Sequence, residues 1–259
     1  MKDIIVRPGL VSISFRSHSP ENIVKAFEGT GLEGIEWGGD VHAPHGDLLR
    51  ARHLAALCRD AGIAIAVYGS YLRFAEGDPD WNAVLDSAEA LGAPLIRVWA
   101  GRAASASFSP TARLQLVEKI GFFVADAAER KLRVAVEYHA DTLTDTDDSA
   151  IALLHAVPGL QSLWQPPHRM SFHSRAESLR RIQPFLANLH VFNWGYDGKE
   201  RRSLAEAAEA WTEYLRIAQA GEGEAERWAL LEFMSNDEIS ALRREAELLR
   251  KIITQESDR

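Results

Sequence analysis

The sequence predicts an α/β fold in which short strands alternate with longer helices along the whole chain. Three observations support this prediction: eight short runs of β-branched and apolar residues, an amphipathic stretch after each of them, and no linker or low-complexity segment in the 259 residues. Eight strand–helix units in a chain of this length are typical of a single (β/α)8 TIM barrel. An open doubly wound sheet is the alternative, but it needs a reversal of strand order and usually has fewer units. We therefore predict one barrel domain over residues 1–259.

The predicted strands are short, and β-branched and aromatic residues are frequent in them, which suits a buried parallel sheet. In chain order they cover residues 9–15, 34–37, 63–69, 95–100, 133–138, 160–164, 189–192 and 228–233.

The predicted helices have apolar residues at i, i+3 and i+4 and a polar opposite face. They cover residues 22–30, 47–62, 81–93, 111–131, 144–154, 174–187, 204–220 and 239–255. Glycine ends several of them before the next strand, as in "DAGIAIAV", and a hydroxyl or acidic cap starts others, as in "TDTDDSAIALL". Cys58 falls inside the second helix, where we expect it to pack in the core.

Composition excludes several classes of protein. The formal net charge is -8 and the basic residues are scattered, which argues against nucleic acid as a partner. No apolar run reaches the roughly 18 residues of a membrane span, so no membrane partner is expected. A single cysteine allows no internal disulfide and fits a reducing, cytoplasmic location. The sequence leaves the oligomeric state open, including a homo-oligomer.

Polar side chains stand at the ends of four consecutive predicted strands. In a barrel the chemistry lies at the carboxyl ends of the strands. Alternation turns Glu137 of the fifth strand and Glu232 of the eighth into the barrel, and His190 of the seventh likewise, while Gln165 ends the sixth. Carboxylates inside apolar strands are costly unless they are paired or bind a cation. These four residues therefore predict a site for a divalent ion such as Mn²⁺, Mg²⁺, Co²⁺ or Zn²⁺.

Other residues near the strand ends are expected to contact a substrate. Tryptophans at a barrel mouth suit the apolar faces of a small polyhydroxylated ligand, and an arginine can neutralise an anionic group. The predicted substrate contacts are His42, Arg97, Trp37, Trp99 and Trp194, and Trp164 is a further candidate for the wall.

With these residues identified, the chain resembles the xylose isomerase-like TIM barrel superfamily, whose members include sugar phosphate isomerases and epimerases. The most specific segments are "GIEWGGDVHAPHGD", "VEYHADTLTDT" and "LLEF". The resemblance implies a metal set of Glu, Asp, His and Glu on the last four strands, which Glu137, His190 and Glu232 match. Gln165 stands where the family usually has aspartate, and His168 matches a histidine that contacts substrate. An amide keeps an oxygen donor but removes a charge, so we expect weaker metal affinity.

The resulting functional prediction is a metal-dependent isomerase or epimerase of a small sugar or polyol derivative. The ion would stabilise an enediolate, and Glu137 and Glu232 would exchange protons as the acid/base pair that the resemblance implies. His139 and His168 would orient hydroxyl groups. A dehydratase acting on a hydroxy acid is one alternative, and a non-catalytic sugar-binding barrel with a weakened metal site is another. A DNA-repair endonuclease is disfavoured by the acidic charge balance.

Overall fold

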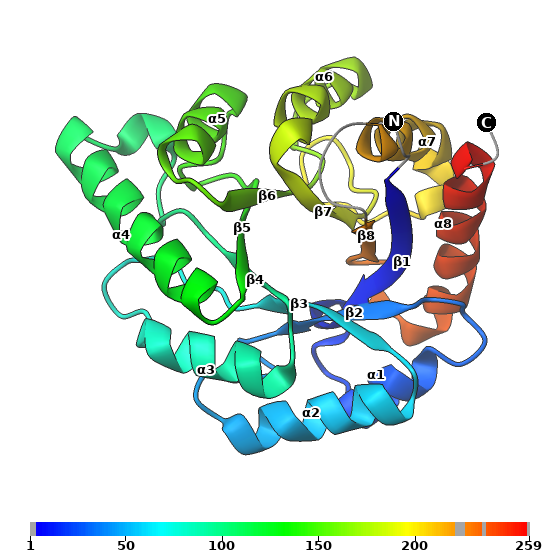
Figure 1. Ribbon diagram of the computed structural model, residues 1–259. Coiled ribbons are helices and arrows are strands. Elements are labelled where there is room, and N and C mark those ends of the chain that lie inside the picture. The colour runs from blue at the N-terminus through cyan, green and yellow to red at the C-terminus, as the bar shows by residue number, and fades with distance from the viewer. Residues whose placement is uncertain (1–3, 221–225, 235–236, 258–259) are drawn as a thin grey trace.

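The eight strands close into a parallel barrel surrounded by helices (Figure 1). The computed structural model describes residues 4–220, 226–234 and 237–257. The strand order is sequential, and β1 closes the barrel by pairing with β8. The strands are β1 Ile5–Val11, β2 Gly34–Gly38, β3 Ala64–Gly69, β4 Leu95–Val98, β5 Arg133–Glu137, β6 Leu160–Trp164, β7 Leu186–Val191 and β8 Glu226–Leu231. The predicted TIM barrel is confirmed.

One helix follows each strand, as the amphipathic stretches predicted. The helices are α1 Pro20–Ala26, α2 Leu48–Asp60, α3 Trp81–Leu91, α4 Pro110–Glu129, α5 Asp147–Ala156, α6 Phe172–Ile182, α7 Ala208–Gln219 and α8 Leu242–Ser257. Short 3-10 helices lie at Ser12–Phe15, Ser105–Ser107, Gln183–Phe185, Leu204–Ala207 and Ile239–Ala241. Hydroxyl or carboxylate side chains accept a backbone N–H at the start of α1 to α6, for example Ser109 before α4 and Thr146 before α5. These caps satisfy amides that have no partner inside the helix.

The prediction for the first strand, residues 9–15, was wrong in its limits. β1 ends at Val11, and Ser12–Phe15 form a 3-10 turn. The hydroxyls of Ser12 and Ser14 replace strand pairing here: Ser12 Oγ accepts the N–H of Gly38 at 2.9 Å, and Ser14 Oγ accepts the N–H of Phe233 at 3.0 Å. These side-chain bonds hold the chain after β1 against the ends of β2 and β8.

Strand alternation separates two apolar layers. Ala135, Leu163 and Leu230 belong to a small cluster inside the barrel. Val134 and Val136 belong to the larger cluster between the barrel and the helices. Because successive side chains point to opposite faces, Glu137 lies on the inner face with Ala135, as predicted.

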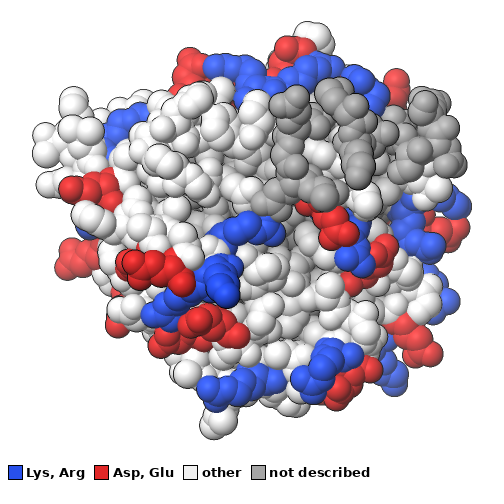
Figure 2. All heavy atoms as spheres, viewed as in Figure 1, with Lys and Arg blue, Asp and Glu red and all other residues white. Residues whose placement is uncertain are grey.

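The surface carries both signs of charge. On the face in Figure 2, basic and acidic side chains are interspersed, and no large area of one sign is visible. Among the described residues, no helix is long and apolar enough to cross a membrane.

Candidate active site at the carboxyl ends of the strands

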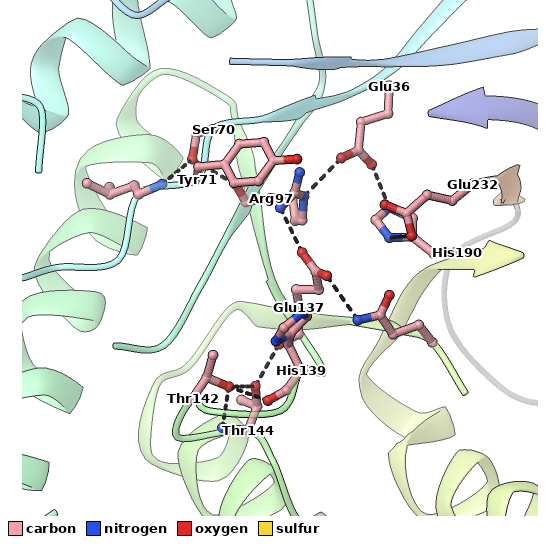
Figure 3. A network of polar contacts seen from close by, with 12 residues as sticks. Glu36, Ser70, Tyr71, Arg97, Glu137, His139, Thr142, Thr144, His190 and Glu232 are labelled. Atoms are coloured by element: carbon pink, nitrogen blue, oxygen red, sulfur yellow. Dashed lines mark hydrogen bonds and ion pairs between the residues drawn. The ribbon is translucent and has the colours of Figure 1, made fainter. Parts of the chain in front are cut away.

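Six polar side chains from different strands meet at the carboxyl end of the barrel (Figure 3). The backbone places four of them within strands and two immediately after one. They are Glu36 in β2, Arg97 in β4, Glu137 in β5, His190 in β7, Gln165 after β6 and Glu232 after β8. Five of the six are buried, and Gln165 is half-buried. Buried charged side chains are tolerated only when they neutralise one another or bind an added ion.

Arg97 is the centre of this cluster. Its side chain is 1% exposed, its Nε donates to Glu36 Oε1 at 2.9 Å, and its Nη1 donates to Glu137 Oε2 at 2.7 Å. The ring of Tyr71 lies 4.3 Å from the guanidinium carbon. Only glycine leaves room beside the pair, because a Cβ at Gly69 would lie 2.5 Å from both Arg97 Nη2 and Glu36 Oε1. The arginine thus joins two carboxylates that come from strands on either side of it in the sequence.

His190 lies between two carboxylates. Its Nε2 is 3.0 Å from Glu36 Oε2, and its Nδ1 is 3.4 Å from Glu232 Oε2. The second distance is long for a hydrogen bond, and this buried Nδ1 has no hydrogen-bond partner within the described residues. Burial would lower the pKa of His190, but the nearby carboxylates, Glu232 first, outweigh it and raise the pKa to about 9. Burial also raises the pKa of Glu232 to about 7, although His190 acts in the opposite direction.

Gln165 holds Glu137 from the side opposite the arginine. Its Nε2 donates to Glu137 Oε1 at 3.0 Å. Both oxygens of Glu137 therefore accept hydrogen bonds, one from Arg97 and one from Gln165. An aspartate at position 165 could not make this contact, because a carboxylate has no proton to donate.

The residues fit a divalent ion. His190 Nδ1 is a buried nitrogen without a hydrogen-bond partner, and the Glu232 carboxylate faces it. Glu137 and Gln165 add a carboxylate and an amide oxygen on the neighbouring strands. Oxygen donors with one imidazole suit Mg²⁺, Mn²⁺ or Co²⁺. In the described ranges, no three His, Cys, Asp or Glu side chains already stand together as a metal-binding group.

A cavity of about 230 Å³ opens above the polar cluster, and Arg97, Glu137, Gln165 and Glu232 form part of its lining. Its walls are aromatic.

Two tryptophan–histidine pairs form these walls. Trp99 packs against His139 with ring centroids 4.1 Å apart, and Trp194 stacks on His168 at 5.1 Å and 13°. All four residues line the cavity, in agreement with their predicted place at the barrel mouth.

Three further arginines lie at or beside the cavity. The guanidinium of Arg73 lies 3.6 Å from the Trp99 ring centroid, and that of Arg201 lies 5.7 Å from the Trp194 centroid. Arg16 also lines the cavity, where its side chain contacts Asp40 and the Tyr71 hydroxyl. Two of these arginines are already paired with carboxylates, Arg16 with Asp40 and Arg201 with Asp237.

Comparison with protein families matches residues 24–194 to the model described as xylose isomerase-like TIM barrel. The chain belongs to this family. Its prediction from the sequence is confirmed.

Individual relatives share the fold and part of the sequence. A 3-dehydroshikimate dehydratase from Bacillus anthracis is 27% identical over 203 residues, which are 71% of this chain and 70% of the relative. The crystal structure of the probable 3-DHS dehydratase AsbF, involved in petrobactin synthesis in the same organism, has a TM-score of 0.69 at 23% identity and covers 95% of this chain and 99% of that one. A xylose isomerase-like TIM barrel protein from Mycobacterium smegmatis in complex with magnesium has a TM-score of 0.67 at 14% identity, covering 98% and 97%.

Two tryptophans that were predicted to line the cavity of this chain do not lie there. Trp37 and Trp164 are 0% exposed and pack between the barrel and the helices. Trp37 Nε1 is 3.3 Å from Cys58 Sγ, and Trp164 contacts Ser178. The prediction that they line the mouth was wrong, because each is the strand neighbour of an inward polar residue and therefore points outward.

His42 and Arg97 also differ from their predicted roles. His42 is buried, with Nδ1 3.0 Å from Ser12 Oγ and Nε2 3.3 Å from the carbonyl oxygen of His18. It braces the loop after β2 and does not line the cavity. Arg97 lines the cavity, but two of its donors are bound to Glu36 and Glu137, so it organises the floor and is not a free anion ligand.

Sequence reasoning missed three residues of the site. They are Glu36, Tyr71 and Phe233, for which the sequence predicted no role. Tyr71 has φ 59° and Phe233 has φ 49°, and both line the cavity. Bulky residues rarely adopt this left-handed conformation, and its cost is typically accepted at functional sites. Nothing in the residue types Tyr and Phe signals it, whereas Glu36 in an apolar strand was a readable signal.

Proposed function

We propose that this protein is a divalent-metal-dependent lyase that removes a proton beside a carbonyl of a small hydroxy acid and releases water. The observation that carries the proposal is the difference between its two glutamates. Both oxygens of Glu137 accept hydrogen bonds, from Arg97 and Gln165. The contact described for the Glu232 carboxylate is His190 Nδ1 at 3.4 Å. One glutamate is thus held as a fixed carboxylate, and the other is available to take a proton.

The chain's own residues have distinct parts in this reaction. Glu137, Gln165, His190 and Glu232 would hold the ion, which when bound polarises the substrate carbonyl. Glu232 takes the proton from the adjacent carbon, and the C–H electron pair forms a double bond as the neighbouring C–O bond breaks. The proton then passes to the departing hydroxide, which leaves as water and restores the carboxylate.

Arg73 supports an acidic substrate. Its guanidinium lies beside the cavity wall at Trp99, whereas Arg16 and Arg201 are already paired with Asp40 and Asp237, and Arg97 with Glu36 and Glu137. The aromatic walls suit a flat ring. A cyclic hydroxy acid such as the 3-dehydroshikimate named for the Bacillus relative combines both features.

Isomerisation or epimerisation of a sugar derivative is the second candidate. Glu137 and Glu232 both border the cavity, and two carboxylates can exchange protons on either side of one carbon. This reaction requires Glu137 to release one of its two hydrogen bonds, which lyase chemistry does not require.

One experiment separates these functions. The Mn²⁺-loaded protein is incubated in D2O with 3-dehydroshikimate and, separately, with a panel of ketohexoses, and products are followed by NMR and mass spectrometry. Loss of water from the acid supports the lyase, whereas deuterium uptake without loss of water supports an isomerase. Glu232→Gln should abolish turnover of the acid. Full activity of this variant, or no reaction with either substrate class, contradicts the proposal.

A further inference from the structure

Glu36 and Arg97 carry buried charge that the proposed chemistry does not use. Glu36 is 0% exposed and lies on β2, whereas the proposed ion ligands lie in or directly after β5 to β8. Its two oxygens face different partners, Arg97 Nε at 2.9 Å and His190 Nε2 at 3.0 Å. Figure 3 shows this row from Arg97 through Glu36 to His190 and Glu232.

The hydrogen-bonding capacity of these groups fixes the direction of each bond. A guanidinium only donates, and a carboxylate only accepts. Glu36 must therefore accept from Arg97 at one oxygen and from His190 Nε2–H at the other. The remaining nitrogen, Nδ1, is the one without a hydrogen-bond partner, and it faces Glu232.

We propose that Glu36, held by Arg97, is a positioning residue that keeps the proton of neutral His190 on Nε2 and so presents Nδ1 to the divalent ion. The inference rests on the metal site of the proposed function. A metal-bound histidine commonly donates its second N–H to a carboxylate, which fixes the ring and its tautomer.

Because of Arg97, replacing one carboxylate oxygen of Glu36 by an amide nitrogen is enough to change the tautomer of His190. In Glu36→Gln, the Nε–H of Arg97 still needs an acceptor and therefore selects the oxygen of the new amide. The NH2 group of that amide then faces His190 Nε2, which has to accept. The proton of neutral His190 moves to Nδ1, where it blocks the ion.

The matched control is Glu137→Gln. It makes the same change in a carboxylate that also accepts from Arg97, at 2.7 Å, but its side chain has no described hydrogen bond to His190. We expect Glu137→Gln to weaken ion binding, because a ligand is lost, and to leave the His190 tautomer unchanged.

The first measurement is the tautomer of His190 in protein labelled with ¹⁵N-histidine. Long-range ¹H–¹⁵N spectra distinguish a protonated from an unprotonated ring nitrogen, and His190→Asn assigns the signal among the nine histidines. In Zn²⁺-loaded wild type, and in metal-free wild type at a pH where its own spectrum shows a neutral ring, we expect the proton on Nε2, the nitrogen 3.0 Å from Glu36. A proton on Nδ1, or on both nitrogens in the presence of Zn²⁺, overturns the inference without any variant.

The second measurement is Mn²⁺ affinity by calorimetry. Glu36→Gln should weaken it between about 10- and 100-fold, the usual range for losing such a partner. Wild-type affinity in Glu36→Gln with an unchanged tautomer refutes the positioning role. Absence of Mn²⁺ binding in wild type refutes the proposed metal site instead, and the metal-free spectrum of the neutral ring still decides the role of Glu36. If Glu36→Gln does not fold, the wild-type spectra remain the test.

Discussion

Replacing Gln165 by aspartate should make the stability of the protein depend on the proposed divalent ion. The amide now donates to Glu137 Oε1 at 3.0 Å, and a hydrogen bond to a charged group contributes about 1.5–3 kcal/mol. Aspartate is one methylene shorter, so two carboxylates would stand about 4 Å apart, where their repulsion is about 1 kcal/mol in water and about 4 kcal/mol at an effective dielectric constant near 20. Because Gln165 is half-buried, we expect the charge of the introduced aspartate to lower the free energy of unfolding by about 2 kcal/mol.

Gln165→Asn is the control, since it has the length of aspartate without the charge. In urea unfolding at pH 7.5 with a chelator, Gln165→Asp should be less stable than Gln165→Asn by about 2 kcal/mol. The difference should vanish below about pH 4, where a shared proton removes the repulsion. With Mn²⁺ present the order should reverse, because a third carboxylate strengthens the site. Equal stability and equal Mn²⁺ affinity of the two variants would show that position 165 faces neither Glu137 nor the ion.

Three further predictions concern the same region and its surroundings. Gly69→Ala should lower both the melting temperature and Mn²⁺ affinity, because the added Cβ would displace Arg97 and Glu36. The control is Gly121→Ala in α4, where a Cβ meets nothing within 4 Å, and it should be neutral or stabilising. Equal effects of the two substitutions would contradict the close approach of Arg97 and Glu36 to Gly69. The Cys58 thiol is buried, and burial raises its pKa to about 11. It should react with an aromatic disulfide at pH 8 only after unfolding, because little thiolate exists below that pKa. Rapid reaction of the native protein would contradict the buried position of Cys58. Saturation with Mn²⁺ at 100 times its dissociation constant should stabilise the protein by about 2.7 kcal/mol over the chelated form, and an unchanged unfolding curve would argue against the site.

The inner face of the barrel could be predicted from the sequence because strand alternation is strict. In a strand, odd and even positions point to opposite faces, so the apolar positions that face the helices also tell where a single carboxylate or imidazole points. Glu137 and His190 lie where this rule places them. The same rule applied to Trp37 would have placed it outside, since its neighbour Glu36 points inward. A position near the strand end is therefore not sufficient to place a side chain in the barrel mouth; its parity along the strand decides the face.

The pairing of Arg97 could not be predicted. Its partners are 61 and 40 residues away in the chain, and several arginines stand near strand ends. Which of them enters the barrel depends on the space that Gly69 leaves, a property of the assembled strands. The end of β1 was also beyond prediction, because "GLVSISF" is equally apolar on both sides of Val11 and only the contacts of Ser12 and Ser14 end the strand.

The seam between β1 and β8 has a consequence for how the protein is made. The ribosome delivers β1 first and β8 last, and β1 has β8 as one of its two neighbours. Until residues 226–234 have emerged, β1 and β7 each keep an open edge, Ser14 lacks the N–H of Phe233, and Glu232 is absent from the floor. Binding of the proposed ion through Glu232 would therefore begin only after β8 has been made, and a nascent chain stalled before β8 would expose two strand edges to other chains.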